Sequence, residues 1–377
     1  MRHGLAMATT VFKESFKFYK KRQPPPDLAG VIDLRKDYVP EPYRVSEHEL
    51  TPPPAHLPRP FGVKPTESLR LFSVADNPGL FIIPAALTEA GQHHWMLRCL
   101  KELPDVPHKC NLDAHLATPR AEGSSLYRES EKEFLQTDKA KADLFALPIY
   151  KLRWTTLGYH YDYNTKTYSD DDLTPFPPDL SHLSRYLASL IGYGDAYSAE
   201  AAIVNYYHLD STLSGHTDHS EDDLEAPLLS LSFGHDAVFL IGGETLDVAP
   251  TPLYLRSGDL VVLWKEARLA YHGVPRICDE SSLPPLDYSR LEDGGGEAED
   301  RARLPELLTR ELDLVEELKN NPLKFKDKDF KTPKELKFDG GSTFYHHYLK
   351  FTRININIRQ VKTKACVRET PCKKLKS

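Results

Sequence analysis

The stretch that most constrains the fold of this chain runs from Arg353 to Arg359 and alternates isoleucine with arginine or asparagine. In an extended strand successive side chains point to opposite faces, so the isoleucines share one face and both arginines share the other. A buried guanidinium group needs an anion, and its planar fork fits a carboxylate or a phosphate. The run therefore predicts a strand in the wall of a barrel that binds a carboxylate-bearing ligand. An exposed edge strand with solvated arginines is the alternative that the pattern leaves open.

Composition limits the class of protein. The 377 residues, of which 40% are hydrophobic and 27% charged, suffice for one large or two modest globular domains. A formal net charge of −7 argues against a strongly basic surface over the whole chain, although it permits local basic patches. The five cysteines show no Cys-x-x-Cys spacing and no paired framework, which indicates a reduced, intracellular compartment. No segment is apolar over the length of a membrane span, so we expect no membrane association.

The chain divides into successive parts that differ in composition. We predict an N-terminal helix and a proline-rich extension in residues 1–67, helices and the first strands of the domain in 68–200, the barrel in 201–361 with an acidic and then lysine-rich insertion at 278–343, and a basic tail in 362–377. The N-terminal helix is lysine-rich and has its apolar residues on one face, so docking on the domain is favoured over a transit peptide.

Hydrophobic periodicity predicts the secondary structure. Strands are expected at the period-two segments Gly79–Pro84, Lys151–Thr156, Gly158–Tyr163, Ala201–Tyr207, Leu228–Phe233, Ala237–Ile241, Leu253–Leu255, Leu260–Trp264 and Arg353–Arg359. Helices are expected at Thr88–Lys101, with Thr88 as the N-cap, and at Ser125–Gln136, Asp179–Ile191 and Leu304–Leu318. Many short antiparallel strands with helices packed outside them predict the α+β class and a double-stranded β-helix core of the jelly-roll or cupin-like kind.

A metal site is predicted from His216, Asp218 and the distant His272. The His-x-Asp spacing lets two ligands on one extended segment reach the same ion. The spacing alone is weak evidence in a chain with 16 histidines. Similar His-x-acid pairs begin at His160, His208 and His219. The pair at His216 differs from these because it follows a Ser-Gly turn. In addition, an isolated histidine, His272, comes after a later predicted strand.

The triad also explains the arginine strand. Two histidines and an aspartate on a β-barrel suit Fe(II) and leave three coordination positions open. A 2-oxo acid can chelate iron at those positions while Arg353 or Arg359, on a neighbouring strand, binds its far carboxylate. A zinc site would use four ligands, or three and a water, and would not need the arginines, so iron is the favoured metal.

Taken in order along the chain, these segments resemble the AlkB family of Fe(II)/2-oxoglutarate dioxygenases, and within it the animal type-1 branch. The resemblance lies in Asn205-Tyr206-Tyr207, His216-Thr217-Asp218, Ser257-Gly258-Asp259, Tyr271-His272-Gly273-Val274-Pro275-Arg276 and Arg353-Ile354-Asn355-Ile356-Asn357-Ile358-Arg359. It implies Fe(II) as the cofactor, with His216, Asp218 and His272 as its ligands and as the catalytic residues. It also implies 2-oxoglutarate and O2 as co-substrates, and it assigns the contacts with 2-oxoglutarate to Asn205, Tyr207, Arg353, Asn355 and Arg359. The implied reaction oxidises a methyl group on a base nitrogen and releases formaldehyde, succinate and CO2.

The family carries a nucleotide-recognition lid, and residues 152–161 resemble it. In such a lid an unpaired or flipped base stacks on aromatic rings. The candidates for contacts with the substrate are Tyr127, Trp154, Tyr159, His160, Tyr161 and Glu221. Cross-strand packing is the alternative for each aromatic residue. The acid that helps to read the base in the bacterial member is replaced here by Ser220, with Glu221 following, so the base preference of that member is not carried over.

Three classes of function remain open. The first is oxidative demethylation or hydroxylation of methylated bases in DNA and/or tRNA. The second is the same chemistry on a protein methyl-lysine, for example in a histone, and the third is metal-independent cleavage of abasic DNA through a lysine Schiff base. For the first class we expect a monomer whose partner is nucleic acid with methylated bases, in the nucleus and/or mitochondrion and with the cytoplasm as a further compartment.

Overall fold

The structure is a computed structural model that describes residues 10–136, 144–194, 196–286, 304–320 and 343–362. The basic tail predicted for 362–377, apart from its first residue, lies outside the described residues, as do the acidic and the lysine-rich stretches of the predicted insertion.

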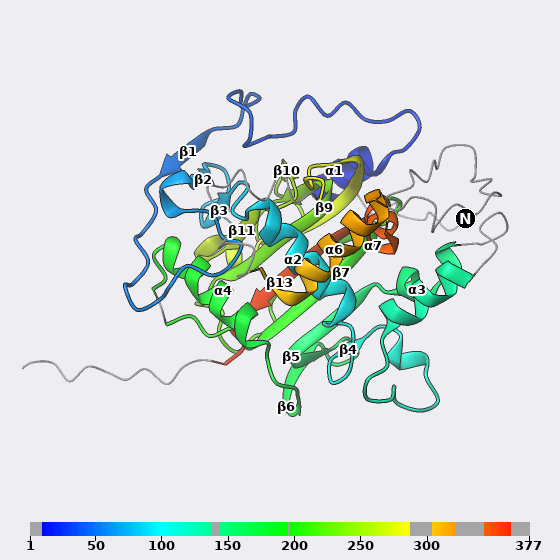
Figure 1. Ribbon diagram of the computed structural model, residues 1–377. Coiled ribbons are helices and arrows are strands. Elements are labelled where there is room, and N and C mark those ends of the chain that lie inside the picture. Colours follow the sequence, from blue (N-terminus) through cyan, green and yellow to red (C-terminus); the bar gives the residue numbers. More distant parts are fainter. Residues whose placement is uncertain (1–9, 137–143, 195, 287–303, 321–342, 363–377) are drawn as a thin grey trace, which may run out of the picture.

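The core is one antiparallel sheet of 13 strands (Figure 1). Its strands are β1 (Val45–His48), β2 (Leu71–Val74), β3 (Leu80–Ile83), β4 (Lys109–Cys110), β5 (Trp154–Asp162), β6 (Thr167–Leu173), β7 (Ala201–His208), β8 (Leu213–His216), β9 (Leu228–Ile241), β10 (Thr251–Leu255), β11 (Leu260–Leu263), β12 (His272–Ser281) and β13 (Thr352–Arg359). The main path runs β1-β2-β3-β11-β9-β13-β7-β5-β4, while β10 and β12 pair with the far half of β9, β8 pairs with β12, and β6 pairs with β5.

Strand β9 joins the two halves of the jelly roll. Its first residues, up to Gly234, pair with β13 and β11, and its last residues, from Ala237, pair with β10 and β12. Gly234 adopts a φ of +80° at the bend, and a Cβ atom there would lie 2.6 Å from the carbonyl oxygen of Thr352. The sequence predicted two strands, Leu228–Phe233 and Ala237–Ile241, because the glycine interrupts the pattern. The structure shows one strand that bends at the glycine, and the predicted jelly-roll core is confirmed.

Helices cover the outer face of the larger half of the sheet, where Figure 1 shows α2, α4 and α6. The helices are α1 (Val11–Lys20), α2 (Glu89–Lys101), α3 (Leu126–Gln136), α4 (Pro178–Leu190), α6 (Glu306–Asn320) and α7 (Phe344–Leu349). Single 3-10 turns occur at η1 (Thr66–Ser68), η2 (Asp113–His115), η3 (Leu144–Ala146), η4 (Pro148–Lys151) and η5 (Lys265–Leu269). The predicted N-cap of α2 is confirmed, since the Thr88 hydroxyl accepts a hydrogen bond from the amide of Gly91 at 3.1 Å.

The side chains of β13 alternate between two apolar cores. Ile354, Ile356 and Ile358 are fully buried beneath the helices with residues of α2 and α4. The arginines and asparagines of β13 point instead to the space between the halves of the sheet, where residues of β3, β9, β10, β11 and β12 form the second core. The prediction of a barrel-wall strand is confirmed, and the exposed-edge alternative is wrong, because β13 lies between β9 and β7.

The N-terminal helix α1 packs against β12 and β8. Phe12 of α1 is 1% exposed and belongs to a third apolar core with residues of β9 and β12. It lies so close to Gly215 that a Cβ atom on that glycine would be 2.6 Å from the Phe12 ring. After α1 the chain crosses to β10, where Ile32 forms a parallel bridge with Leu253.

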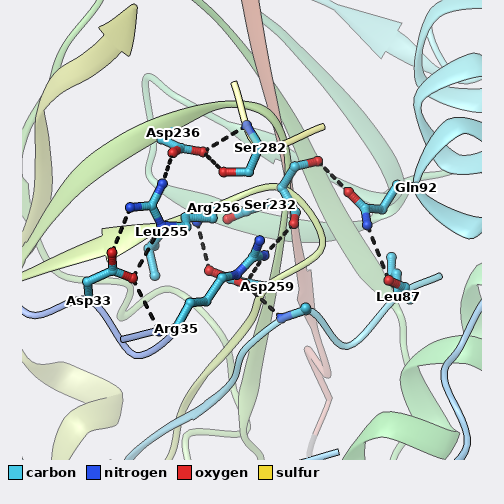
Figure 2. A network of polar contacts seen from close by, with 12 residues as sticks. Asp33, Arg35, Leu87, Gln92, Ser232, Asp236, Leu255, Arg256, Asp259 and Ser282 are labelled. Atoms are coloured by element: carbon cyan, nitrogen blue, oxygen red, sulfur yellow. Dashed lines mark hydrogen bonds and ion pairs between the residues drawn. The ribbon is translucent and has the colours of Figure 1, made fainter. Parts of the chain in front are cut away.

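Ion pairs fasten this segment to the barrel, as Figure 2 shows. Arg256 bridges two carboxylates, with Asp33 at 2.7 Å and with Asp236. Arg35 pairs with Asp259 at 2.6 Å and donates to the carbonyl of Ser257. The described N-terminal segment is therefore part of the folded domain.

Candidate metal and co-substrate site

The predicted metal ligands converge at the mouth of the jelly roll. His216 ends β8 and His272 begins β12, and the two residues are opposite each other in the strand pair. Nε2 of His216 lies 3.9 Å from Oδ1 of Asp218, and Nε2 of His272 lies 3.8 Å from Oδ2 of Asp218. All candidate ligand atoms lie within 4.8 Å of one another, so one ion can contact the three side chains. The sequence predicted His272 just after the strand Leu260–Trp264. In the structure His272 is the first residue of β12, a further strand that hydrophobic periodicity did not predict.

Hydrogen bonds orient both imidazole rings for metal binding. Nδ1 of His216 lies 3.0 Å from the carbonyl oxygen of Ser214, and Nδ1 of His272 lies 3.0 Å from that of Ala270. A carbonyl oxygen only accepts, so each Nδ1 carries the proton and each Nε2 presents its lone pair toward Asp218.

The charge states also suit a cation. Burial and the nearby His216 lower the pKa of His272 to about 4, so its imidazole is neutral at neutral pH. Burial alone would raise the pKa of Asp218, but the charge of Arg359 and of the neighbouring histidines lowers it below its usual range. Two imidazoles and one carboxylate are the donor set expected for Fe(II). Among the described residues, His216, Asp218 and His272 form the one group of three or more acidic, histidine or cysteine side chains whose ligand atoms lie close enough together to share an ion.

An inner cavity extends from the ligands into the barrel. Its lining includes Tyr207, Ser230, Phe239, Arg353, Asn355 and Asn357, together with His216 and His272. Arg353 is 2% exposed and donates to the carbonyls of His235 and Leu255 and to the Ser232 hydroxyl, at 2.8, 3.1 and 2.7 Å. Burial lowers its pKa, and none of the ion pairs among the described residues includes it. A buried guanidinium without a carboxylate partner calls for an anionic ligand, because an unpaired charge is costly to bury.

The other residues assigned to 2-oxoglutarate are distributed between this cavity and a second one. Tyr207 and Asn355 line the inner cavity, and the Asn355 amide donates to the Ser230 hydroxyl at 2.8 Å. Arg359 and Asn205 line the second cavity instead, and Arg359 pairs with Asp218 at 2.9 Å. Asn357 lines both cavities and received no role from the sequence, although its place on the polar face of the strand was visible there.

The second, outer cavity opens beside the triad and is walled by aromatic rings. Its lining includes Trp154, Tyr161, Tyr163, Lys166, Tyr168, Asn205, Asp218, Ser220, Glu221, Asn357 and Arg359. Ring centroids are 4.8 Å apart for Trp154 and Tyr163, and 4.9 Å apart for Tyr161 and Tyr163. Tyr163, Lys166 and Tyr168 were not predicted for this site. The alternation of Tyr159, Tyr161 and Tyr163 was a signal for one of them, but β6, which carries Tyr168, is too acidic to be read as a strand.

The structure does not bring all substrate candidates to the outer cavity. Tyr127 is buried between helices, with its ring 5.3 Å from that of Phe344. His160 is 3% exposed and contacts the Thr156 hydroxyl at 2.7 Å. Tyr159 donates to Asp170 on β6 at 3.0 Å. Trp154, Tyr161 and Glu221 do line the cavity.

The fold and the triad define a class of protein, and the comparison of sequences agrees: the chain belongs to the 2OG-Fe(II) oxygenase superfamily, whose family profile matches residues 79–359. Its cofactor is Fe(II), and its co-substrates are 2-oxoglutarate and O2. Within the superfamily it is similar to the nucleic acid dioxygenase ALKBH1 of Homo sapiens, with 37% identity over 73% of this chain and 75% of that one. This bears out the resemblance to the AlkB family.

Further relatives have more specific names. The chain is 30% identical to the DNA N(6)-methyladenine demethylase ALKBH1A of Arabidopsis thaliana, over 81% of both chains. It is 35% identical to the tRNA demethylase abh1 of Schizosaccharomyces pombe, over 60% of this chain and 78% of that one. No helix among the described residues has the length and apolar character that crossing a membrane requires.

Proposed function

We propose that this protein oxidatively removes methyl groups from bases in nucleic acid, with Fe(II), 2-oxoglutarate and O2. The observation that carries the proposal is the outer cavity, whose aromatic wall of Trp154, Tyr161 and Tyr163 stands beside Asp218. Planar bases stack on such rings, and the methyl group of a base held there would face the metal ligands. The names of the relatives from human, plant and fission yeast support the same substrate class.

The residues of the site have separable tasks in this reaction. His216, Asp218 and His272 would hold Fe(II), which activates O2 together with 2-oxoglutarate for oxidation of the methyl group. Arg353 binds the far carboxylate of 2-oxoglutarate in the inner cavity, because it is the buried cation there without an acidic partner. Apolar residues of the second core surround that cavity and limit the entry of water.

The outer cavity supplies the groups that hold the base. Tyr161 and Trp154 offer ring faces, and Lys166 offers a positive charge at the same wall. Asn205, whose strand partner is Trp154, can donate to or accept from a base edge. These side chains orient the base, and the metal and its co-substrate supply the oxidation.

The decisive experiment is mass spectrometry of nucleosides after incubation of modified DNA and tRNA with the protein, Fe(II), ascorbate and 2-oxoglutarate. We expect loss of one or more methylated bases, with one formaldehyde released for each methyl group removed. Omission of 2-oxoglutarate, addition of a chelator, or the variant Asp218→Ala should each abolish the loss.

The same assay separates the other classes of function. Turnover of a methyl-lysine peptide without turnover of any nucleic acid would reject the proposal. Borohydride trapping of an adduct with abasic DNA in the presence of chelator would instead indicate a lysine Schiff base.

A further inference from the structure

A closed ring of ion pairs lies behind the metal ligand Asp218. Arg268 pairs through Nη2 with Oε2 of Glu221 at 2.9 Å, and Glu221 pairs through Oε1 with Nε of Arg359 at 2.9 Å. Arg359 then reaches Oδ2 of Asp218 with Nη2 at 2.9 Å. Arg268 closes the ring, because its Nη1 donates to the backbone carbonyl of Asp218 at 2.6 Å.

The ring is buried and its charges alternate. The side chains of Arg268, Glu221 and Arg359 are 2%, 2% and 4% exposed. Two guanidinium groups face two carboxylates, so no charge in the ring is left without an opposite one. Buried ion pairs of this kind contribute little net stability, but they fix the geometry of the groups that they connect. Their role therefore lies in the position of the groups that they connect.

The ring connects the segments that lie next to the metal ligands in the chain. Asp218 and Glu221 lie in the segment after β8, which ends with His216. Arg268 lies in η5, a few residues before His272 at the start of β12, and Arg359 ends β13. One guanidinium group, that of Arg268, thus holds the backbone of the aspartate ligand at a fixed distance from the segment that leads to the second histidine.

Both carboxylate oxygens of Glu221 already have partners within the protein. Oε2 accepts from Arg268, and Oε1 forms an ion pair with Arg359 and accepts from the Tyr168 hydroxyl at 3.4 Å. A donor on a nucleobase would have to compete with these buried contacts. They favour a positioning role for Glu221 over a contact with the base.

From this geometry we propose that Arg268 and Glu221 are positioning residues of the metal site, which hold Asp218 and Arg359 in the arrangement that binds the ion. The proposal rests on the membership of the superfamily and not on the nucleic acid substrate. A failed demethylation assay would leave it intact, because its test contains no nucleic acid.

The test is titration of the metal-free protein with Co(II) in the presence of 2-oxoglutarate, followed by visible absorption. Partners that orient a metal ligand typically change metal affinity by about 10- to 100-fold when they are replaced. We expect Arg268→Lys and Glu221→Gln to weaken Co(II) binding to this extent and to change the shape of the Co(II) absorption band. Parental affinity and an unchanged band in both variants would overturn the proposal.

A matched control is Arg256→Lys. Arg256 also bridges two carboxylates, Asp33 and Asp236, but contacts no metal ligand. Its replacement should lower the melting temperature and leave Co(II) affinity and spectrum at their parental values. If Arg256→Lys weakened Co(II) binding as strongly as Arg268→Lys, the effect would be one of general stability, and the positioning role would be rejected.

A double variant decides the matter if Arg268→Lys fails to fold. Arg268→Met with Glu221→Met removes one positive and one negative charge together, and replacements of this kind are tolerated in buried ion pairs. We expect this protein to fold and to show the weakened affinity and altered band. Parental Co(II) binding in the double variant would overturn the proposal.

Discussion

Among the single residues that the structure describes, Arg353 stands apart because it is buried without an ion pair to a carboxylate. Arg359, on the same strand, has two carboxylate partners in Asp218 and Glu221. Within the described part of the chain, Arg353 donates to two carbonyls and one hydroxyl. The sequence could assign both arginines to one polar face, but it could not tell which of them is already neutralised. That difference depends on segments far away in the chain, and it favours Arg353 for the proposed contact with the far carboxylate.

We predict that Arg353→Ala weakens binding of 2-oxoglutarate by roughly 2 to 5 kcal/mol, as truncation of one partner in a buried charge pair does. Calorimetric titration of the Mn(II)-loaded protein with 2-oxoglutarate measures the change, and Mn(II) affinity should stay near the parental value. Arg359→Ala should instead weaken Mn(II) itself, because it removes an ion pair with a metal ligand. The assignment is wrong if Arg353→Ala binds 2-oxoglutarate as the parent does.

At the scale of elements, the segment 152–161 that was predicted as a lid includes most of β5, which pairs with β6 and shifts register between Tyr159 and Tyr161. The two tyrosines have different surroundings. Tyr161 lines the outer cavity, whereas Tyr159 packs beside Lys362 with its ring centroid 5.5 Å from Nζ. Simple alternation in the sequence placed both tyrosines on one face and could not distinguish them.

Tyr161→Ala should therefore reduce turnover of a methylated oligonucleotide far more than Tyr159→Ala. A stacked base contributes about 1 to 3 kcal/mol, which corresponds to a loss of roughly 5- to 150-fold in kcat/KM. Consumption of 2-oxoglutarate in the absence of nucleic acid should be the same in both variants and in the parent. Equal losses in the two variants would remove the aromatic wall from the account of substrate binding.

Helix α1 allows a prediction about stability. Phe12 is buried against Gly215, whereas Phe18 on the same helix is 49% exposed. Phe12→Ala should lower the free energy of unfolding by about 3 to 5 kcal/mol, because it leaves a cavity between the helix and the sheet. Phe18→Ala should change it by no more than about 0.5 kcal/mol. Urea denaturation of the metal-free variants gives both values, and a small loss for Phe12→Ala would mean that α1 is not docked in solution.

The sequence predicted helices and strands well where hydrophobic periodicity and helix capping determine them locally. Helices α2, α3 and α4 and strands β7, β11 and β13 lie within a few residues of their predicted limits. Strands β1, β2, β4, β6 and β8 were missed because they are short or polar and are held by pairing rather than by their own composition. Strand β12 was missed as well, and it contains Pro275, a residue that argues against a strand. The metal ligands His216 and His272 thus lie on two paired strands that the sequence did not predict.

At the scale of the whole molecule, the net charge of −7 means that phosphate contacts must come from local basic side chains, and Lys166 at the outer cavity is one of those that the structure describes. Recognition then depends mainly on whether a base can leave its stack. We predict faster turnover for a methylated base in a hairpin loop or a bulge than in a matched duplex, since extrusion from a duplex costs a few kcal/mol. Rates measured at one salt concentration test this. Equal rates on the three substrates would contradict it.

The N-terminal segment can form its native contacts only late in synthesis, because its partners lie far along the chain. Asp33 pairs with Arg256, a residue 223 positions later in the chain. At about 5 to 20 residues per second, a ribosome takes on the order of 10 to 45 s to supply that partner. During this time Phe12 and Ile32 have no barrel to pack against, and such distant contacts slow folding. Phe12, Ile32 and Asp33 are thus synthesised long before their native neighbours in the barrel.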